Sequence, residues 1–193
     1  DSTEWLMIVD TDEFFFSVGE KNLAETLRDY DDYAAVSGNW ILFTSNQVEK
    51  IPDRDLMIDR LVQYVSNDDL HVKTIVKPRY VKYISHPHYP NLLKGFAQVD
   101  ENKQYFRGPF LPSPSHKIFR VNHYVTRDLD FYRNQKLLRV HMRGGNNDLD
   151  DMYLDEKIKE YNVYCKKLPT ENVDYSISKF SQPIKELLGY IHN

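Results

Sequence analysis

The hydrophobic pattern opens with an apolar run of strand length, Leu6 to Val9, which charged residues follow at once. An unbroken apolar run of this length predicts a strand that is buried on both faces. Three acidic residues come next within four positions, at Asp10, Asp12 and Glu13. Buried carboxylates need partners, and ligands of open α/β sheets bind at the carboxyl ends of strands. We therefore predict a divalent cation here, the alternative being an acidic turn that caps the next helix.

Hydrophobic periodicity predicts further elements along the whole chain. The first half is expected to contain a helix over 19–30, a strand, kink and second strand over 33–45 with the break at Gly38-Asn39, and a helix from Pro52 to Val65 capped by Asp53 or Asp55. Later patterns predict strands over 71–84 broken at Pro78, a strand over 119–125, and a short helix over 128–136 with Asp128 at its cap. A hinge over 143–147, an amphipathic helix over 149–166 and a last helix over 183–191 complete the prediction.

The middle segment, residues 86–114, breaks these patterns. Prolines recur through it, and its apolar residues follow neither the helical nor the strand period. Long irregular segments of a compact domain commonly carry function. We therefore predict loops that lie over a pocket.

Length, charge and cysteine content limit the function. A chain of 193 residues without an internal repeat predicts one α/β domain over 1–193. The net charge of −4 and the absence of a basic run argue against a nucleic-acid partner, and no apolar run reaches the roughly 18–20 residues of a membrane span. A lone Cys165 excludes an internal disulfide and a cysteine zinc site but leaves the compartment, cytoplasm or secretory lumen, open. Because a buried parallel strand normally has earlier βα units beside it, we expect a fragment that begins at the metal-binding strand.

Four short motifs occur in a characteristic order. They are Asp-x-Asp-Glu-Phe at 10–14, Asn-Trp-x-x-Phe at 39–43, Lys-x-Ile-x-Lys-Pro at 73–78 with His86 beyond it, and Asn-His-Tyr-x-Thr-Arg at 122–127 with Lys136 beyond it. Together they resemble the GT-A glycosyltransferases of the family 2 and family 92 type, over residues 5 to about 165. Thr44 departs from that pattern, since it stands where the family usually has glycine.

The resemblance implies both a fold and an activity. The fold would be an α/β mixed sheet flanked by helices, here without the N-terminal nucleotide-binding βα units. The activity would be metal-dependent transfer of a sugar from a nucleotide-sugar donor to a glycan or another hydroxyl acceptor. The cofactor would be Mn²⁺ or Mg²⁺, with Asp12 and His123 as ligands and Asp10 either bound through water or in contact with the ribose.

The remaining site residues are expected around this ion. Donor contacts are expected from Glu13, Asn122, Tyr124, Arg127 and Lys136; the cationic ones suit diphosphate oxygens, and Glu13 is equally a helix cap. Acceptor contacts are expected from Trp40, His86 and Tyr89, although Trp40 is also a good core residue. A general base for an inverting transfer is expected among Asp148, Asp150 and Asp151, which are equally suited to capping the long helix.

Two other functions agree with parts of the pattern. A haloacid-dehalogenase-like phosphatase also has a hydrophobic strand that ends in Asp-x-Asp, and Asp10 would then be the nucleophile. Phe14 and the Asn122-His123-Tyr124 segment do not match that family. The second alternative is a non-catalytic, carbohydrate-binding remnant of a transferase.

Overall fold

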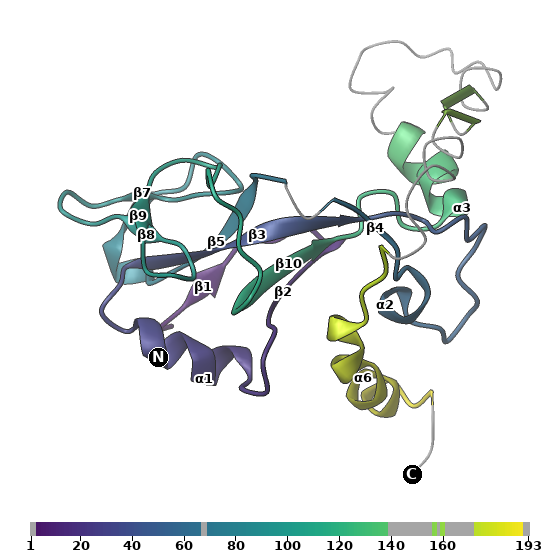
Figure 1. Ribbon diagram of the computed structural model, residues 1–193, viewed down its shortest axis with the longest axis horizontal. Coiled ribbons are helices and arrows are strands. Elements are labelled where there is room, and N and C mark those ends of the chain that lie inside the picture. Colours follow the sequence, from purple (N-terminus) through teal and green to yellow (C-terminus); the bar gives the residue numbers. More distant parts are fainter. Residues whose placement is uncertain (1–2, 67–68, 139–155, 158, 161–171, 191–193) are drawn as a thin grey trace. The chain divides into compact units, whose positions relative to one another are not determined.

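The computed structural model describes residues 3–66, 69–138, 156–157, 159–160 and 172–190 (Figure 1). The contacts within the chain divide it into two compact units. Unit 1 comprises Asp1–Ile41 and Ser66–His123, and unit 2 comprises Leu42–Val65 and Tyr124–Asn193. The predicted α/β class is confirmed, since a mixed sheet is combined with a few helices. The expectation of a single domain stays a prediction.

The main sheet of unit 1 is built from short strands in the order β1-β5-β3-β10-β2. These strands are β1 Leu6–Met7, β5 Val72–Val76, β3 Ala35–Phe43, β10 Phe119–His123 and β2 Glu13–Ser17. The strands β8 (Gln98–Val99) and β9 (Tyr105–Phe106) extend it, and β8 runs parallel to β3. The pairs β1–β5, β3–β5 and β2–β10 are antiparallel. The register of β2 and β10 places His123 opposite Glu13, at the acidic segment.

Unit 1 has one apolar core between this sheet and a short helical segment. The helix α1 (Leu23–Leu27) continues into a 3-10 turn, η1 (Arg28–Tyr30), below the sheet in Figure 1. The core residues are Phe15, Leu27, Tyr30, Val36, Ile75, Val99, Phe119 and Val121. A capping box starts α1, since Asn22 and Glu25 each bond the backbone N–H of the other. The helix predicted over 19–30 is therefore confirmed in a shorter form.

The kink predicted at Gly38 is wrong, because β3 runs without interruption through it. A Cβ atom at Gly38 would lie 2.9 Å from a ring carbon of Phe15 and 3.3 Å from the Cβ of Phe119. Glycine is thus required by the close approach of the Phe15 ring to the strand, which the sequence pattern cannot distinguish from a bend.

The strand predicted at Leu6–Val9 is also different from the expectation. It was expected to be central and buried on both faces, but β1 has only two residues and stands at the end of the strand order. Leu6, Ile8 and Val9 are 43%, 47% and 40% exposed. The physical reason is that burial depends on what covers a strand, and β1 pairs only with β5 among the described strands.

Unit 2 contains short helices and one short strand. They are α2 Met57–Arg60, β4 Tyr64–Ser66, α3 Leu129–Phe131, the π-helical segment η3 Tyr132–Leu137, the 3-10 segment η4 Ser176–Phe180 and α6 Ser181–Leu187. Asp128 caps α3 as predicted, accepting from the backbone N–H of Phe131 at 2.8 Å. The last helix is confirmed as well and begins at Ser181.

The helix predicted from Pro52 to Val65 is wrong, since only Met57–Arg60 is helical. The backbone beyond it is used for strand pairing, because Gln63 forms a bridge with Val173 and the Tyr64 N–H donates to Asn172 O at 3.0 Å. Neither Asp53 nor Asp55 caps α2. The predicted hinge over 143–147 and most of the predicted helix over 149–166 lie outside the described residues.

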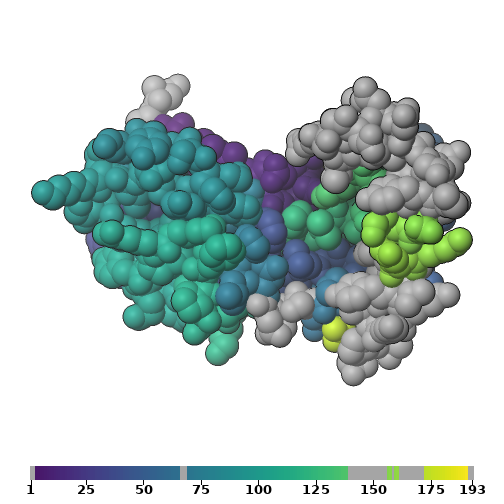
Figure 2. All heavy atoms as spheres, turned by 90° about the horizontal axis from the view of Figure 1, so that it is seen from above, coloured from purple at the N-terminus to yellow at the C-terminus, as the bar shows by residue number. Residues whose placement is uncertain are grey.

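The proline-rich middle segment has little regular structure, as predicted. Before it, a 3-10 turn η2 (Pro78–Tyr80) leads into β6 (Val81–Tyr83), which pairs with β7 (Asn91–Leu92). This segment and its neighbours form the continuous teal surface in Figure 2. In the parts of the chain that the structure describes, no helix has the length and apolar character that crossing a membrane requires.

Candidate functional site

The acidic segment folds as a tight turn that is closed by two hydrogen bonds. The backbone N–H of Glu13 donates to Asp10 O at 3.1 Å, and the backbone N–H of Asp10 donates to Glu13 Oε2 at 3.0 Å. The Glu13 side chain has no exposed surface, whereas that of Asp10 is 68% exposed. Glu13 therefore fixes the turn from inside. We expected it to contact a donor, and its burial offers a donor no surface.

Lys73 is the buried cation behind this turn. Its Nζ lies 2.9 Å from Glu13 Oε2 and 3.2 Å from Asp10 Oδ2, and its side chain is 1% exposed. Burial raises the pKa of Glu13, against the hydrogen bonds from Lys73 and from the Asp10 backbone N–H. We had expected Asp10 to serve a metal ion, and in the structure it is paired with Lys73.

The sequence reasoning gave Lys73 no role. Its partner Asp10 is 63 positions away in the chain, so no local pattern links them. One signal was available, namely a lysine in the second position of an apolar strand, Val72-Lys73-Thr74-Ile75-Val76. Lysine is seldom fully buried unless it is paired, so a lysine at such a position predicts an acidic partner.

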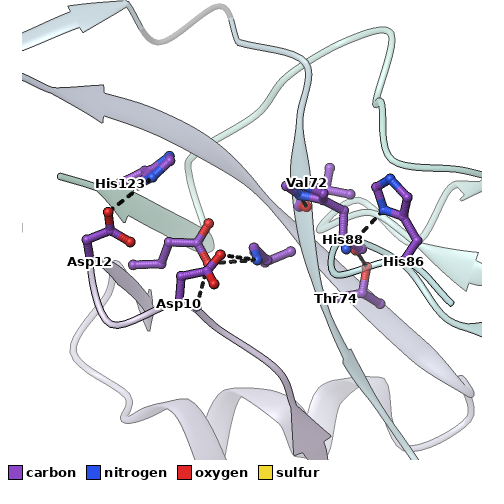
Figure 3. Close-up of polar contacts among 9 residues, drawn as sticks. Asp10, Asp12, Val72, Thr74, His86, His88 and His123 are labelled. Atoms are coloured by element: carbon purple, nitrogen blue, oxygen red, sulfur yellow. Dashed lines mark hydrogen bonds and ion pairs between the residues drawn. The ribbon is translucent and has the colours of Figure 1, made fainter. Parts of the chain in front are cut away.

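Asp12 lies on the other side of the turn, beside His123. Asp12 Oδ2 is 3.8 Å from His123 Nε2, and the side chains are 15% and 10% exposed. Figure 3 shows the two side chains facing each other, with Asp10 on the same turn. The cause is the β2–β10 register, which sets His123 opposite Glu13 and so next to Asp12. The structure thus brings together two of the three residues expected at a metal.

This pair can be tested against the geometry of a divalent cation. Mg²⁺ holds its ligands at about 2.0–2.1 Å, so two donors of one ion lie at most about 4.2 Å apart. The 3.8 Å between Asp12 and His123 is within that limit. Among the described residues, no group of three or more His, Cys, Asp or Glu side chains could hold an ion. Mg²⁺ commonly uses one or two carboxylates beside substrate phosphates in near-octahedral geometry, where adjacent donors lie about 2.9 Å apart. Asp12 and His123 would therefore have to approach each other from 3.8 Å to bind one ion as adjacent ligands.

Trp40 is surrounded by three imidazoles, and we call Trp40, His71, His88 and His123 the Trp40 cluster. The ring centroids of His71, His88 and His123 lie 4.9, 4.9 and 4.2 Å from that of Trp40. Asp69 orients His71, because its Oδ1 lies 2.8 Å from His71 Nδ1. The Trp40 side chain is therefore partly buried, and its ring contacts the imidazoles of the site. The cluster extends the site from the acidic turn toward the loops.

One ring nitrogen of His88 has a defined hydrogen-bond partner in this cluster. Its Nδ1 lies 2.9 Å from Val72 O, a pure acceptor, so Nδ1 carries the proton and donates. Burial lowers the pKa of His88, and the charge of Lys73 adds to this effect although the bond to Val72 opposes it. In the neutral ring Nε2 is therefore the acceptor. The Thr74 hydroxyl donates to His88 O at 2.8 Å and fixes the loop (Figure 3).

His86 and Tyr89 lie next to this cluster. The His86 ring is 5.1 Å from the rings of both His88 and Tyr89, and the His88 backbone N–H donates to His86 Nδ1 at 3.3 Å. The three expected acceptor residues are therefore linked by ring contacts that run from Trp40 through His88 and His86 to Tyr89. His71, His88 and Asp69 were not predicted as site residues, although the Asp-x-His spacing was visible in the sequence.

The other expected donor residues are either fully buried or belong to unit 2. Asn122 is fully buried in β10. Tyr124 is also fully buried, with its ring 4.8 Å from that of Phe43 inside unit 2, so it offers no surface where we expected a contact. The Arg127 guanidinium lies 4.0 Å from the Phe131 ring. Because Arg127 and Lys136 belong to unit 2, their contact with a donor stays a prediction.

The proposed general bases, Asp148, Asp150 and Asp151, lie outside the described residues, so their role stays a prediction. The family resemblance rests on the motifs of the sequence alone. No protein-family model and no curated protein matches the chain.

Proposed function

We propose that the chain is a metal-dependent glycosyltransferase with a GT-A-like site, which moves a sugar from a nucleotide-sugar donor to a hydroxyl of a carbohydrate acceptor. The observation that supports this most is the pairing of Asp12 with His123, at 3.8 Å, on a turn fixed by buried groups. The Asp12 carboxylate is a ligand type that suits Mn²⁺ or Mg²⁺, and His123 lies close enough to join it after a small side-chain movement. The motif resemblance supplies the substrate class.

Each residue of the turn has a distinct part in this proposal. Asp12 and His123 hold the ion, which when bound would act as a Lewis acid toward the diphosphate leaving group. Lys73 and Glu13 hold the backbone so that Asp12 stays beside His123. Asp10 remains largely exposed, which suits contact with the ribose or with a metal-bound water.

In this proposal the acceptor binds over the Trp40 cluster. In the neutral ring of His88, Nε2 can accept a hydrogen bond from a sugar hydroxyl. Tyr89 adds an aromatic ring next to His86. One carboxylate among Asp148, Asp150 and Asp151 would take the proton of the attacking hydroxyl.

Sugar transfer with defined donors tests the proposal. The protein is incubated with Mn²⁺, a panel of nucleotide sugars and saccharide acceptors, and nucleoside diphosphate release is measured. Asp12→Asn and His123→Gln are each expected to lower the rate by about 100-fold or more, as expected when a charge-stabilising group is removed. Asp53→Asn, an exposed carboxylate of unit 2, is the matched control and keeps full activity.

The controls separate chemistry from folding. Circular dichroism and the unfolding midpoint should be alike in Asp12→Asn, Asp53→Asn and the unaltered chain. Full activity in excess chelator would contradict the proposed metal dependence. No transfer from any nucleotide sugar in the panel would contradict the proposed activity itself.

A further inference from the structure

A pocket lies in the proline-rich segment of unit 1, and no residue of the acidic turn lines it. It has a volume of about 300 Å³ and is lined by residues 89–98 and 106–108. This volume is at the lower end of the range for small-molecule sites. Two cations line it, Lys94 and Arg107, and no carboxylate does. We call it the Lys94 pocket.

The two cations of this pocket lack anionic partners. Within the described residues, neither Lys94 nor Arg107 takes part in a hydrogen bond, an ion pair or a ring contact. Three other lysines of unit 1 have carboxylate partners: Lys21 pairs with Asp29, Lys73 with Glu13, and Lys77 with Asp31. Two unpaired cations on one pocket favour an anionic ligand.

The walls of the pocket are fixed before any ligand binds. The Phe96 ring stacks on Tyr80 with centroids 4.2 Å apart. The Gln98 side chain donates to Gly108 O at 2.7 Å and joins the two walls. Gly95 adopts a φ of 94°, a left-handed conformation that favours glycine, at the turn that carries Lys94. A preformed pocket loses little entropy on binding.

Tyr89 connects this pocket to the proposed active site. It lines the Lys94 pocket, and its ring also lies 5.1 Å from that of His86, which in turn adjoins His88 of the Trp40 cluster. A saccharide whose reacting hydroxyl lies near the cluster can therefore extend along Tyr89 into the pocket. Aromatic rings such as Tyr89 and Phe106 provide flat surfaces for the apolar faces of sugars.

We propose that the Lys94 pocket binds an acidic sugar unit of the acceptor, with its carboxylate against Lys94 and Arg107. This inference deepens the proposed function and rests on it for the role of acceptor. The site itself stands on the unpaired cations, the preformed walls and the shared Tyr89. A neutral sugar has no carboxylate to pair with these two cations, so the pocket discriminates by charge.

Direct binding measurements test the proposal without donor or metal. Titration calorimetry in chelator compares glucuronate, glucose and inorganic sulfate on the full chain. Glucuronate is expected to bind at least about 10-fold more tightly than glucose or sulfate, because only it offers both the ring and the charge. Lys94→Gln and Arg107→Gln should each weaken glucuronate about 10-fold, as for one charge-assisted hydrogen bond. Lys117→Gln, an exposed lysine that does not line the pocket, is the matched control and should change nothing.

Three results of the binding measurements would overturn the inference. They are equal binding of glucuronate and glucose, binding of sulfate as tight as that of glucuronate, and glucuronate binding that both Lys94→Gln and Arg107→Gln leave unchanged. The proposed function fails in a different way. Charge-selective binding without any sugar transfer would retain the acidic-sugar site and contradict the transferase. Transfer that is indifferent to Lys94 and Arg107 would retain the transferase and remove this site.

Discussion

Two glutamates of unit 1 are equally buried and have opposite surroundings. Glu101 and Glu13 are 3% and 4% exposed. The Glu101 carboxylate accepts from the Ser115 hydroxyl and from the backbone N–H groups of Lys117, Ile118 and Phe119, the latter at 2.8–3.0 Å. Glu13 Oε1 has no hydrogen-bond partner among the described residues, and its Oε2 is shared by Lys73 and the Asp10 backbone.

The two pKa values follow these surroundings. Burial acts to raise the pKa of Glu101, but the bonds from Ser115 and the three backbone N–H groups outweigh it, and the pKa is lowered. Burial also raises the pKa of Glu13, and there the fewer bonds do not overcome it. A carboxylate with all its acceptors satisfied holds the fold together. One with an unsatisfied oxygen, beside two further acidic side chains, is characteristic of a functional site.

The largest effect is expected when the Glu101 carboxylate is removed. Glu101→Ala leaves the Ser115 hydroxyl and three backbone N–H groups, of which that of Phe119 is buried, without their acceptor. At roughly 1–3 kcal/mol for each buried unsatisfied group, partly relieved by water, the free energy of unfolding should fall by about 3–5 kcal/mol. Urea denaturation measures this, with Glu20→Gln as an exposed control. A loss below about 1 kcal/mol would show that the two glutamates do not differ as described.

A smaller effect is expected at the other carboxylate. Lys73→Met leaves Glu13 without its buried cation, but Glu13 can take up a proton, so we expect a loss of about 2–3 kcal/mol. The double variant Glu13→Met/Lys73→Met should regain part of that stability, because no buried charge remains. Urea denaturation of the four proteins in this cycle gives the coupling energy. Simple additivity would contradict a buried ion pair.

The sequence predicted the parts of the site that are encoded locally. The Asp10–Glu13 cluster, the strand predicted over 119–125 and the cap at Asp128 all lie within short patterns. The structure confirms each as a local feature, with the strand ending at His123. Local patterns do not predict the approach of Asp12 to His123, because it depends on the β2–β10 register. The motif resemblance suggested it.

The features that the sequence did not predict depend on distant partners. Lys73 pairs with Asp10, which is 63 positions away in the sequence. An apolar strand pattern does not predict which acidic residue a buried lysine will pair with. Gly38 is explained only by the Phe15 ring that lies against it. The apolar spacing from Leu56 to Val65 fits a helix, but Gln63 and Tyr64 pair with residues 172–173 and are extended there.

The comparison also predicts opposite dependences of stability on pH. The folded pKa of Glu101 is lowered from 4.5, so its contribution is present above pH 4.5 and is lost as the pH falls through the folded value. The folded pKa of Glu13 is raised from 4.5, so its contribution is present below pH 4.5 and is lost as the pH rises through the folded value. The urea midpoint of the unaltered chain should converge with that of Glu101→Gln as the pH falls. The difference between the unaltered chain and Glu13→Gln should change with pH in the opposite direction. If both differences change with pH in the same direction, the assignment is contradicted.

The smallest effect on stability is expected from the hydrogen bond between Tyr30 and the backbone of Glu101. The Tyr30 hydroxyl donates to Glu101 O at 2.6 Å, and burial together with the charges of Glu101 and Asp100 raises the pKa of Tyr30 to about 12. Tyr30→Phe removes this bond and keeps the ring, so the expected loss is about 0.5–1.5 kcal/mol. Tyr83→Phe, an exposed tyrosine, serves as the control. A change equal to that control would mean that the bond contributes nothing.

The central claim is that Asp12 and His123 hold one divalent cation. Electron spin-echo envelope modulation of Mn²⁺ bound to the full chain tests it most directly, because it detects a nitrogen coordinated to the metal. We expect a ¹⁴N signal in the unaltered protein and in His86→Gln, and its loss in His123→Gln. Asp12→Asn should weaken Mn²⁺ binding itself. Mn²⁺ bound without a nitrogen signal, or a signal that persists in His123→Gln, would contradict the account.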